Sequence, residues 1–384
     1  MPRHQKVART QQSLLGTVSD SDLVRFGKIS EALQNTHAKT SRTQIQGSTQ
    51  KDAQLLGLTL RLPTSEGDRD LEWDICEPNI LLAHVVASCP DLQAAYAVAA
   101  QRVPPTRERP WDLMVCFDEF SPGDKLNYDN TRKAMVLSFN FKQLGDHVLQ
   151  RDYSWMVPIV VRTSKIKRVL GGWSNMLRRF FLIMLLGTHG GATAGITVTI
   201  HDRPLTIYYR VKCLGSDYDG IRMGFDWKGA TSIRCCLRCS NVFKRGSGLA
   251  HRVENGVEST CVDKTKLIER TNEDFENDVD LVTEAGDQWA RGLITKTIKE
   301  DIEKSTAQNF NPLGLFACKE LRPHIRALVC LNQDWVHGIL QSGTMVVEIQ
   351  NFLLELGCAR EAGYNIRFLD LLRCDVKNML LKLY

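Results

Sequence analysis

Two aspartates, each placed directly after an apolar strand-like run, carry the chemistry that this sequence suggests. The run from Leu113 to Phe117 is too short for a helix and is typical of a buried strand, and Asp118 follows it. A second such run, 205–214, ends just before Asp217. A carboxylate at the end of a buried strand is costly without a partner, and Mg²⁺ binds protein carboxylates together with water and phosphate oxygens. The pattern is compatible with a divalent-metal site, although a solvated acid in a turn beside a core strand is the better explanation of any single aspartate of this kind.

The segments around these acids follow a recognisable order. Strand-like runs and one apolar helix occupy 112–118, 133–141, 155–162, 175–186 (the helix) and 205–214. Ser174 is the expected N-cap of the helix, and 196–200 is expected to be a hairpin inserted before the last strand. This order is that of an RNase H-like core, in which the two acids meet at adjacent strand ends. We therefore expect an α/β protein with a mixed sheet.

Length, composition and charge limit the class of protein. The chain has 384 residues, 43% of them apolar, with a net charge of +5 and twelve cysteines. This leaves room for two domains, or for one large domain with an insertion. The charge alone does not establish a nucleic-acid partner, and the cysteines do not suggest a disulfide framework. The longest apolar run cannot cross a bilayer, so we expect a soluble protein that is not held in a membrane.

The chain divides by composition. Residues 1–50 contain seven Lys or Arg against three acids and little periodicity, which predicts a flexible basic arm that suits either a nuclear tail or a mitochondrial transit peptide. The expected parts are the arm (1–54), a small helical pre-domain (55–105), the RNase H-like core (106–234), a polar insertion with short helices and little core (235–330), and a C-terminal helical part completing the core (331–384).

A cluster of cations between the third strand and the helix suits a phosphate backbone. Between Arg162 and Arg179 there are six Lys or Arg and no acid. An ordinary solvated loop explains the same composition equally well. The candidate DNA contacts are Lys165, Lys167, Arg168, Arg178 and Arg179.

A Cys-x-x-Cys pair suggests a second kind of metal site. Cys236 and Cys239 have the spacing of half a zinc site, because two thiolates on one turn can reach a single tetrahedral ion. His337 is the preferred distant ligand, with Cys261 and His251 as other candidates. A redox pair, or two buried thiols, explains the spacing equally well.

The C-terminal segment 339–356 has a helical pattern of apolar residues. Glu348 and Glu355 are seven residues apart and lie on a different face of that helix. Little chain remains before Tyr384, which favours a truncated reading frame.

Several motifs, in this order, resemble a family of transposases. They are Asp118-Glu119-Phe120-Ser121-Pro122-Gly123, Gly171-Gly172-Trp173-Ser174, Lys228-Gly229-Ala230, Cys236-x-x-Cys239-x-Asn241-Val242 and Asp334-x-x-His337. Together they are similar to CACTA and KDZ/Plavaka-type DDE elements of the RNase H superfamily, over residues 60 to 384. The sequence departs from that pattern at Asp217-Tyr218-Asp219, where an Asp followed by Glu is expected.

The resemblance implies a metal-dependent nuclease. Asp118 and Asp217 would be the first two catalytic acids and Glu348 the third, with Glu355 and Glu361 as alternatives. The three would hold two Mg²⁺ or Mn²⁺ ions for cleavage and transfer of transposon-end DNA in the nucleus. The expected zinc site at Cys236, Cys239 and His337 would be structural. Assembly into a homo-oligomer is left open.

Two other functions fit the same residues. The chain could be a catalytically decayed or domesticated transposase that only binds DNA or a partner protein. It could also be a zinc-stabilised interaction protein whose two aspartates are surface acids. The placement of Asp118 relative to Asp217 in the sheet separates these hypotheses.

Overall fold

This computed structural model describes residues 57–65, 70–120, 133–187, 191–261 and 263–333, and the account below is restricted to them. The chain forms two compact units, Met1–Asn332 and Gln333–Tyr384, and nearly all of the second lies outside the described residues. The expected basic arm also lies outside them.

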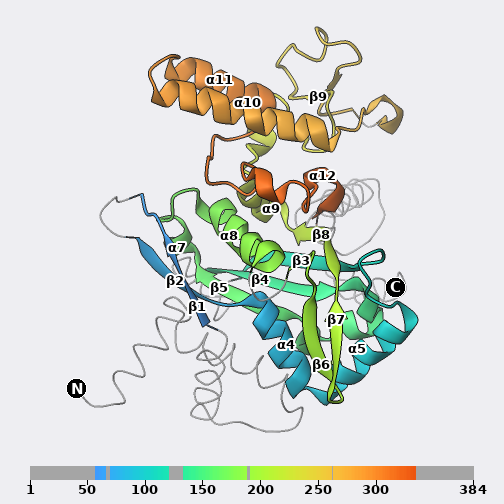
Figure 1. The fold of residues 1–384 in the computed structure, drawn as a ribbon. Helices are drawn as coiled ribbons and strands as arrows, with labels where there is room; N and C mark the ends of the chain where they lie inside the picture. Colours follow the sequence, from blue (N-terminus) through green and yellow to red (C-terminus); the bar gives the residue numbers. More distant parts are fainter. Residues whose placement is uncertain (1–56, 66–69, 121–132, 188–190, 262, 334–384) are drawn as a thin grey trace, which may run out of the picture. The chain divides into compact units, whose positions relative to one another are not determined.

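The described helices and strands follow one another along the chain as drawn in Figure 1. They are β1 (Gly57–Leu62), β2 (Leu71–Cys76), α4 (Pro78–Ser88), α5 (Pro90–Arg102), β3 (Trp111–Phe120), β4 (Ala134–Phe141), α6 (Asp146–Leu149), β5 (Met156–Arg162), α7 (Thr163–Ile166), α8 (Gly172–Leu186), β6 (Ile196–Ile200), β7 (Arg203–Ile207), β8 (Tyr209–Ser216), α9 (Tyr218–Gly224), β9 (Val242–Phe243), β10 (Val257–Glu258), α10 (Asn272–Ala290), α11 (Lys296–Thr306), α12 (Ala327–Cys330) and β11 (Leu331–Gln333).

A mixed sheet of five strands, in the order β11-β8-β3-β4-β5, forms the centre of the first unit. β3, β4 and β5 are consecutive in the chain and pair antiparallel, whereas β3 and β8 pair in parallel. The predicted strands at 112–118, 133–141 and 155–162 are therefore confirmed, as is the α/β class.

The pairing of β3 with β8 contains a one-residue shift. Leu113 pairs with Val211, but Met114 pairs with Cys213, so Lys212 is an extra residue on β8. A bulge of this kind changes which residues of the two strands share a face beyond it.

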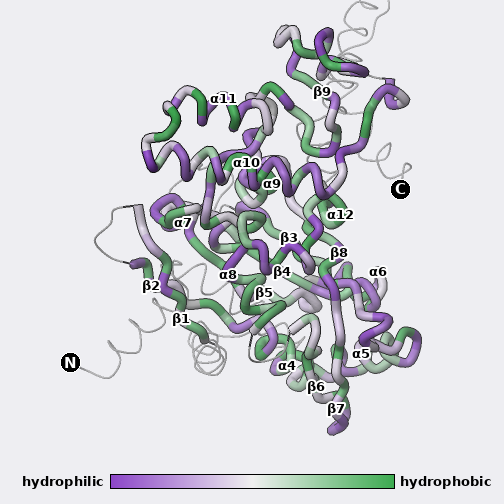
Figure 2. The backbone as a smooth tube through the Cα atoms, turned by 45° about the horizontal axis from the view of Figure 1, so that its top comes forward, coloured by the Kyte–Doolittle hydropathy of each residue, from purple (hydrophilic) through white to green (hydrophobic). Residues whose placement is uncertain are grey.

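Alternation along β3 buries one face of the sheet. Trp111, Leu113, Val115 and Phe117 are buried, and the Phe117 ring lies 6.0 Å from that of Trp173 on α8. The strands carry much apolar sequence in Figure 2, whereas the tubes of α10 and α11 are hydrophilic over long stretches. The core of the first unit is thus built between the sheet and its helices.

Helix α8 begins three residues earlier than predicted. Its N-cap is Gly171, with a φ of 76°, and a Cβ there would come within 2.8 Å of Asn311 Oδ1. The prediction that Ser174 is the N-cap is wrong. Ser174 lies inside the helix and is buried. Its hydroxyl bonds to groups of another segment and does not cap the helix.

The expected pre-domain contributes to the same core as the sheet. Its buried residues include Leu62, Trp73 and Tyr96, and the Tyr96 ring lies 5.9 Å from that of Trp111. The sequence indicated the helices, but not the hairpin of β1 and β2. In the described part of the chain, no single helix is long and apolar enough to cross a membrane, and only α4 and α5 taken together pass that test, with a bend of 105° between them.

The predicted single strand 205–214 is two strands. β7 pairs with β6 in a separate two-stranded hairpin, and β8 belongs to the central sheet. The strand expected at 196–200 is confirmed with its predicted bounds, and its partner is the first half of the 205–214 run.

The segment from 235 to 330 has more regular structure and more core than predicted. α10 has 19 residues and begins with a capping box between Thr271 and Asp274. Phe275 on its inner face is fully buried, 5.1 Å from the ring of Phe316. The prediction of short helices with little core is wrong for this part of the chain. The apolar residues of α10 are widely spaced among acids, so the composition of the segment does not indicate its buried face.

Candidate active site

Asp118 and Asp217 come to the same edge of the sheet. β3 and β8 run parallel, and beyond their last ladder pair Ser216 Oγ donates a hydrogen bond of 2.6 Å to the carbonyl oxygen of Phe117. The two aspartates are the next residues of the two strands. Residues paired across parallel strands share a face, so the register brings both carboxylates to neighbouring positions at one edge.

A backbone amide orients each of these carboxylates. Asp118 is exposed, and its Oδ1 accepts a hydrogen bond of 2.7 Å from the amide of Glu119. Asp217 is half-buried and is the N-cap of α9, where its Oδ1 accepts 2.6 Å from the amide of Gly220. Two oriented oxygen donors at one accessible edge fit Mg²⁺ or Mn²⁺.

Glu119, next to Asp118, has a different role. Its carboxylate accepts 2.8 Å from Lys133 Nζ and 2.7 Å from Thr163 Oγ1. Strand alternation turns it to the opposite face from Asp118. Glu119 therefore ties the ends of β3, β4 and β5 together. The sequence predicts no such role for this residue, although alternation within the strand could have separated it from its neighbour.

The predicted cationic cluster divides into two groups. β5 ends beside the start of β4, where Ala134 pairs with both Phe120 and Arg162, so the cations that follow β5 begin at the same edge as Asp118. There, Lys167 and Arg168 are exposed and Lys165 is half-buried. Arg178 and Arg179 are half-buried on α8, and the Nε atom of each lacks a hydrogen-bond partner among the described residues.

A polar cluster anchors the start of α8. Asp226 accepts 2.6 Å from Ser174 Oγ and 2.8 Å from Asn311 Nδ2. The Ser174 hydroxyl is also within 3.1 Å of the Gly224 carbonyl and accepts from the amide of Leu315. A hydroxyl has one hydrogen, so it cannot donate to Asp226 and Gly224 at once.

Protonation of Asp226 resolves this competition. Burial raises the pKa of Asp226 to about 7, against the smaller lowering effects of the hydrogen bonds from Asn311 and Ser174. A protonated Asp226 donates to Ser174, and Ser174 then donates to Gly224. No feature of the sequence indicated this cluster, because its members come from three distant segments.

Cys236 and Cys239 lie close together. Burial, followed by the neighbouring Cys236, raises the pKa of the Cys239 thiol to about 12. A metal would reverse this by binding the thiolates. The pair fits half of a zinc site, but within the described residues no group of three His, Cys, Asp or Glu could hold a metal.

A buried arginine lies beside the thiols. The Arg270 side chain is 1% exposed and pairs with Asp278, to which Arg234 Nη1 also donates at 3.2 Å. Cys236 is among the charges that raise the pKa of Arg270, although burial, the largest effect, lowers it. The cysteine segment is thus fixed to α10 by an ionic cluster.

Several predicted site residues lie outside the described part of the chain. These are His337 of the expected zinc site, Glu348 as third acid, and the alternatives Glu355 and Glu361. Their positions relative to the carboxylate edge stay predictions.

Comparison with known proteins adds no family to this geometry. No protein-family model matches the chain, and none of the curated proteins is similar enough to it to count as a match.

Proposed function

We propose that this protein is a transposase-like enzyme that cleaves and transfers DNA strands by metal-dependent phosphoryl transfer. The observation that carries the proposal is the convergence of Asp118 and Asp217 at the ends of the parallel strands β3 and β8. Two carboxylates arriving from distant segments at one accessible sheet edge favour a site over two unrelated turn acids.

The order of the strands supports an RNase H-like core. Three consecutive antiparallel strands, β3, β4 and β5, are joined through β3 to a parallel β8. Asp118 lies near the end of β3, and Asp217 directly follows β8. The resemblance of the motifs to DDE elements adds to this argument. We infer that Glu348 supplies the third carboxylate.

Each group at the edge has a role in the proposed reaction. Asp118 and Asp217 would hold Mg²⁺ or Mn²⁺, which when bound supplies activation of the attacking oxygen and stabilisation of the leaving oxygen. Lys167 and Arg168 would bind phosphates of the DNA backbone beside the edge. Lys133 and Thr163 hold Glu119 and so keep the strand ends in place. Catalysis then rests on positioning and charge.

We infer that a zinc ion held by Cys236, Cys239 and His337 is structural. The thiols belong to a segment that the ion pair of Arg234 with Asp278 fixes to α10. Zinc there would link this segment to the C-terminal part of the chain without touching the reacting phosphate.

A catalytically decayed remnant that only binds DNA or protein is the second candidate. The observation that favours it is that Asp118 and Asp217 join no third metal-ligating side chain among the described residues. DNA contacts at Lys167 and Arg168 would serve such a protein equally well.

One experiment separates the two candidates. The purified full chain is incubated with supercoiled plasmid and Mn²⁺, and with labelled oligonucleotides for strand transfer. We expect nicking that Asp118→Ala abolishes. Asp202→Asn is the matched control, because Asp202 is exposed, follows β6 in the β6–β7 hairpin, and has a φ of 63° that asparagine tolerates. DNA binding without Asp118-dependent nicking would favour the remnant.

A further inference from the structure

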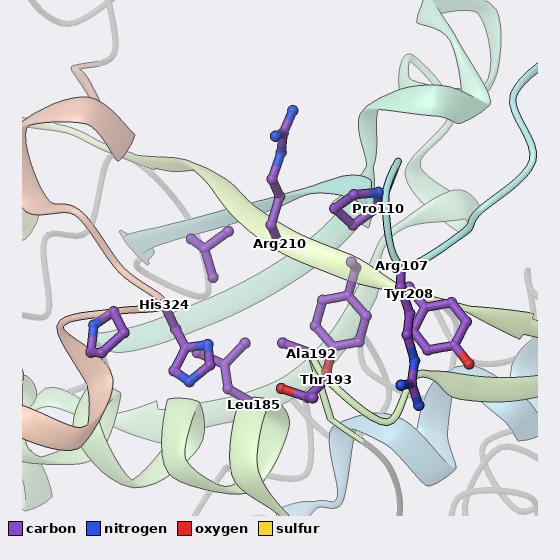
Figure 3. Close-up of a pocket in the computed structure, with 11 residues that line it drawn as sticks. Arg107, Pro110, Leu185, Ala192, Thr193, Tyr208, Arg210 and His324 are labelled. Carbon is purple, nitrogen blue, oxygen red and sulfur yellow. The ribbon is translucent and has the colours of Figure 1, made fainter.

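A pocket of about 300 Å³ lies at the other end of β3 and β8 from the carboxylate edge (Figure 3). Tyr209 is the first residue of β8 and Pro110 directly precedes β3, and both line it. No carboxylate is among the lining residues. They are Arg107, Pro110, Leu185, Ala192, Thr193, Tyr208, Tyr209, Arg210, Val211, Pro323 and His324.

The positive charge available to a ligand comes from Arg107. Its guanidinium lies 5.3 Å from the ring centroid of Tyr208, and Figure 3 shows the two side by side. Within the described part of the chain no carboxylate lies in ion-pair contact with Arg107, although its charge acts on the neighbouring Glu108, whose pKa is lowered by hydrogen bonds with its backbone and Thr106 and then by Arg107. Arg210, in contrast, points away from the cavity and donates to Asp112 at 2.8 Å, so its charge is already balanced.

The remaining walls suit a flat, partly apolar group. Leu185 at the end of α8 and Val211 on β8 are buried and form an apolar surface. Thr193 offers a hydroxyl, and His324 faces the cavity from the loop before α12. An apolar wall with a few polar groups and one accessible cation is the usual composition of a small-ligand site, and this volume is at the small end of the range.

We propose that this pocket binds one nucleotide unit, with its phosphate at Arg107 and its base between Tyr208 and the apolar wall of Leu185 and Val211. Aromatic stacking and an arginine at the phosphate are how proteins bind unpaired nucleotides without reading their sequence. The proposal rests on the proposed function only for the source of the nucleotide, which we take to be a single DNA strand.

The pocket is distinct from the carboxylate edge. β8 has eight residues between Tyr209 and Ser216, and a strand rises about 3.3 Å per residue, so the two sites are roughly 25 Å apart. The pocket would hold a nucleotide several positions from the reacting phosphate. Its loss should therefore weaken DNA binding while leaving the rate at saturating DNA unchanged.

The test uses the full chain in a buffer without Mg²⁺, Mn²⁺ or chelator, so that neither ion occupies the carboxylate edge while a bound zinc ion stays in place. Binding of fluorescein-labelled oligothymidylate is followed by anisotropy, with thymidine monophosphate, thymidine and inorganic phosphate as competitors. We expect Arg107→Gln and Tyr208→Leu each to weaken oligothymidylate binding about tenfold, in line with the loss of one stacked base. Arg109→Gln is the matched control, since Arg109 is equally exposed in the same loop but does not line the pocket. Thermal melts check that the variants fold.

The outcomes separate the sources of the ligand and the two proposals. Arg107-dependent binding of oligothymidylate supports a strand, and Arg107-dependent binding of the monophosphate alone supports a free nucleotide; both support a nucleotide site. Equal losses in Arg107→Gln and Arg109→Gln, or no loss in either, would overturn it. Because the test needs no metal, it can succeed while Asp118-dependent nicking fails, and the reverse also holds.

Discussion

The carboxylate edge of the sheet and the Cys236–Cys239 loop bring their metal-ligating groups together by different physical means. At the edge, a backbone ladder that ends at Cys116 and Gly215 brings the segments that carry Asp118 and Asp217 together from distant parts of the chain. In the loop, two thiols are close because they are close in sequence. The ladder exists without any metal, whereas the thiol pair needs a distant ligand to close a site. The edge should therefore be preformed, and the loop should depend on its ion.

The largest expected effect is the loss of strand cleavage when an edge carboxylate is replaced. Asp217→Asn keeps a side chain that caps α9 and removes the charge. It should lower Mn²⁺-dependent nicking at least about a thousandfold, because a catalytic metal contributes several kcal/mol to the transition state.

The double variant shows whether the edge acts as one unit. Adding Asp118→Asn to Asp217→Asn should cost almost nothing more, because groups that hold the same ions are strongly non-additive. Nicking rates of the four proteins measure this. If the loss of nicking rate in the double variant is the product of the two single losses, Asp118 and Asp217 do not act as one preformed site.

Zinc removal is the corresponding test of the loop. Reduced wild type should contain zinc, and Cys236→Ser should contain none. At a zinc concentration about a thousandfold above the dissociation constant, the free energy of unfolding of Cys236→Ser should be about 4 kcal/mol below that of wild type. Metal analysis and urea unfolding measure the two effects.

Two controls sharpen this test. Cys261→Ser should keep its zinc, since Cys261 joins no metal-ligating group within the described residues, and Asp118→Asn should keep it as well. Wild type without zinc would leave a redox pair or two buried thiols as the account of the loop.

A smaller effect concerns the polar cluster at the start of α8. The folded-state pKa of Asp226 is about 7 against an ordinary 3.8, so the folded chain binds more protons than the unfolded chain between these pH values. Stability should therefore fall as pH rises from about 4 to about 7, by at most about 4 kcal/mol.

Asp226→Asn isolates that pH dependence. The amide can donate to Ser174 and accept from Asn311 at every pH, so the decline should be absent in the variant. Urea unfolding of both proteins at pH 5 and pH 8 measures the difference. Parallel curves would show that Asp226 is ionised in the folded protein.

The carboxylate edge should also couple Mn²⁺ binding to the stability of the protein. Mn²⁺ at a hundredfold excess over its dissociation constant should stabilise wild type by about 2.7 kcal/mol. Asp118→Asn should lose this gain, and Asp124→Asn, at a position outside the described residues where the sequence predicts a turn, should retain it. Thermal melts measure the shift. Equal shifts in wild type and Asp118→Asn would remove the edge as the Mn²⁺ site.

The smallest expected effect is on the salt dependence of DNA binding. Lys167→Gln and Arg168→Gln should each reduce the slope of log affinity against log salt by about 1, because each removes one phosphate contact. Anisotropy titrations at several salt concentrations measure the slope. An unchanged slope in both variants would show that Lys167 and Arg168 do not contact the phosphates of DNA bound at the carboxylate edge.

Local patterns predict most of the strands of the central sheet, and for a physical reason. A buried strand must be apolar and short, so the residue types alone indicate 112–118, 133–141 and 155–162. The single run 205–214 is misassigned because apolar residues continue through Ile207 into Tyr209, although the chain passes there from a hairpin to the central sheet. Nothing in the residue types marks that change of partner.

The candidate site is predictable only in part. Both aspartates can be named, because a charged group after an apolar strand stands out. Their convergence needs the parallel pairing of β3 and β8, which is a property of the whole fold. The roles of Ser174 and Asp226 are not predictable, since one serine hydroxyl has the same sequence signal as an N-cap and as a buried hydrogen-bond partner.

The extra residue Lys212 in β8 has a consequence for how relatives of this gene can differ in length. Val211 and Cys213 already pair with the adjacent residues Leu113 and Met114, so a chain lacking the Lys212 codon can form the same ladder without the bulge. Its two edge acids would still face each other. An inserted or deleted codon in β3 would also break its continuous pairing with β4, where Leu113 and Met114 pair with Phe141 and Asn140, so β3 has no such tolerance. Spacing between the acidic motifs should therefore vary by one residue among functional descendants through β8, and hardly at all through β3.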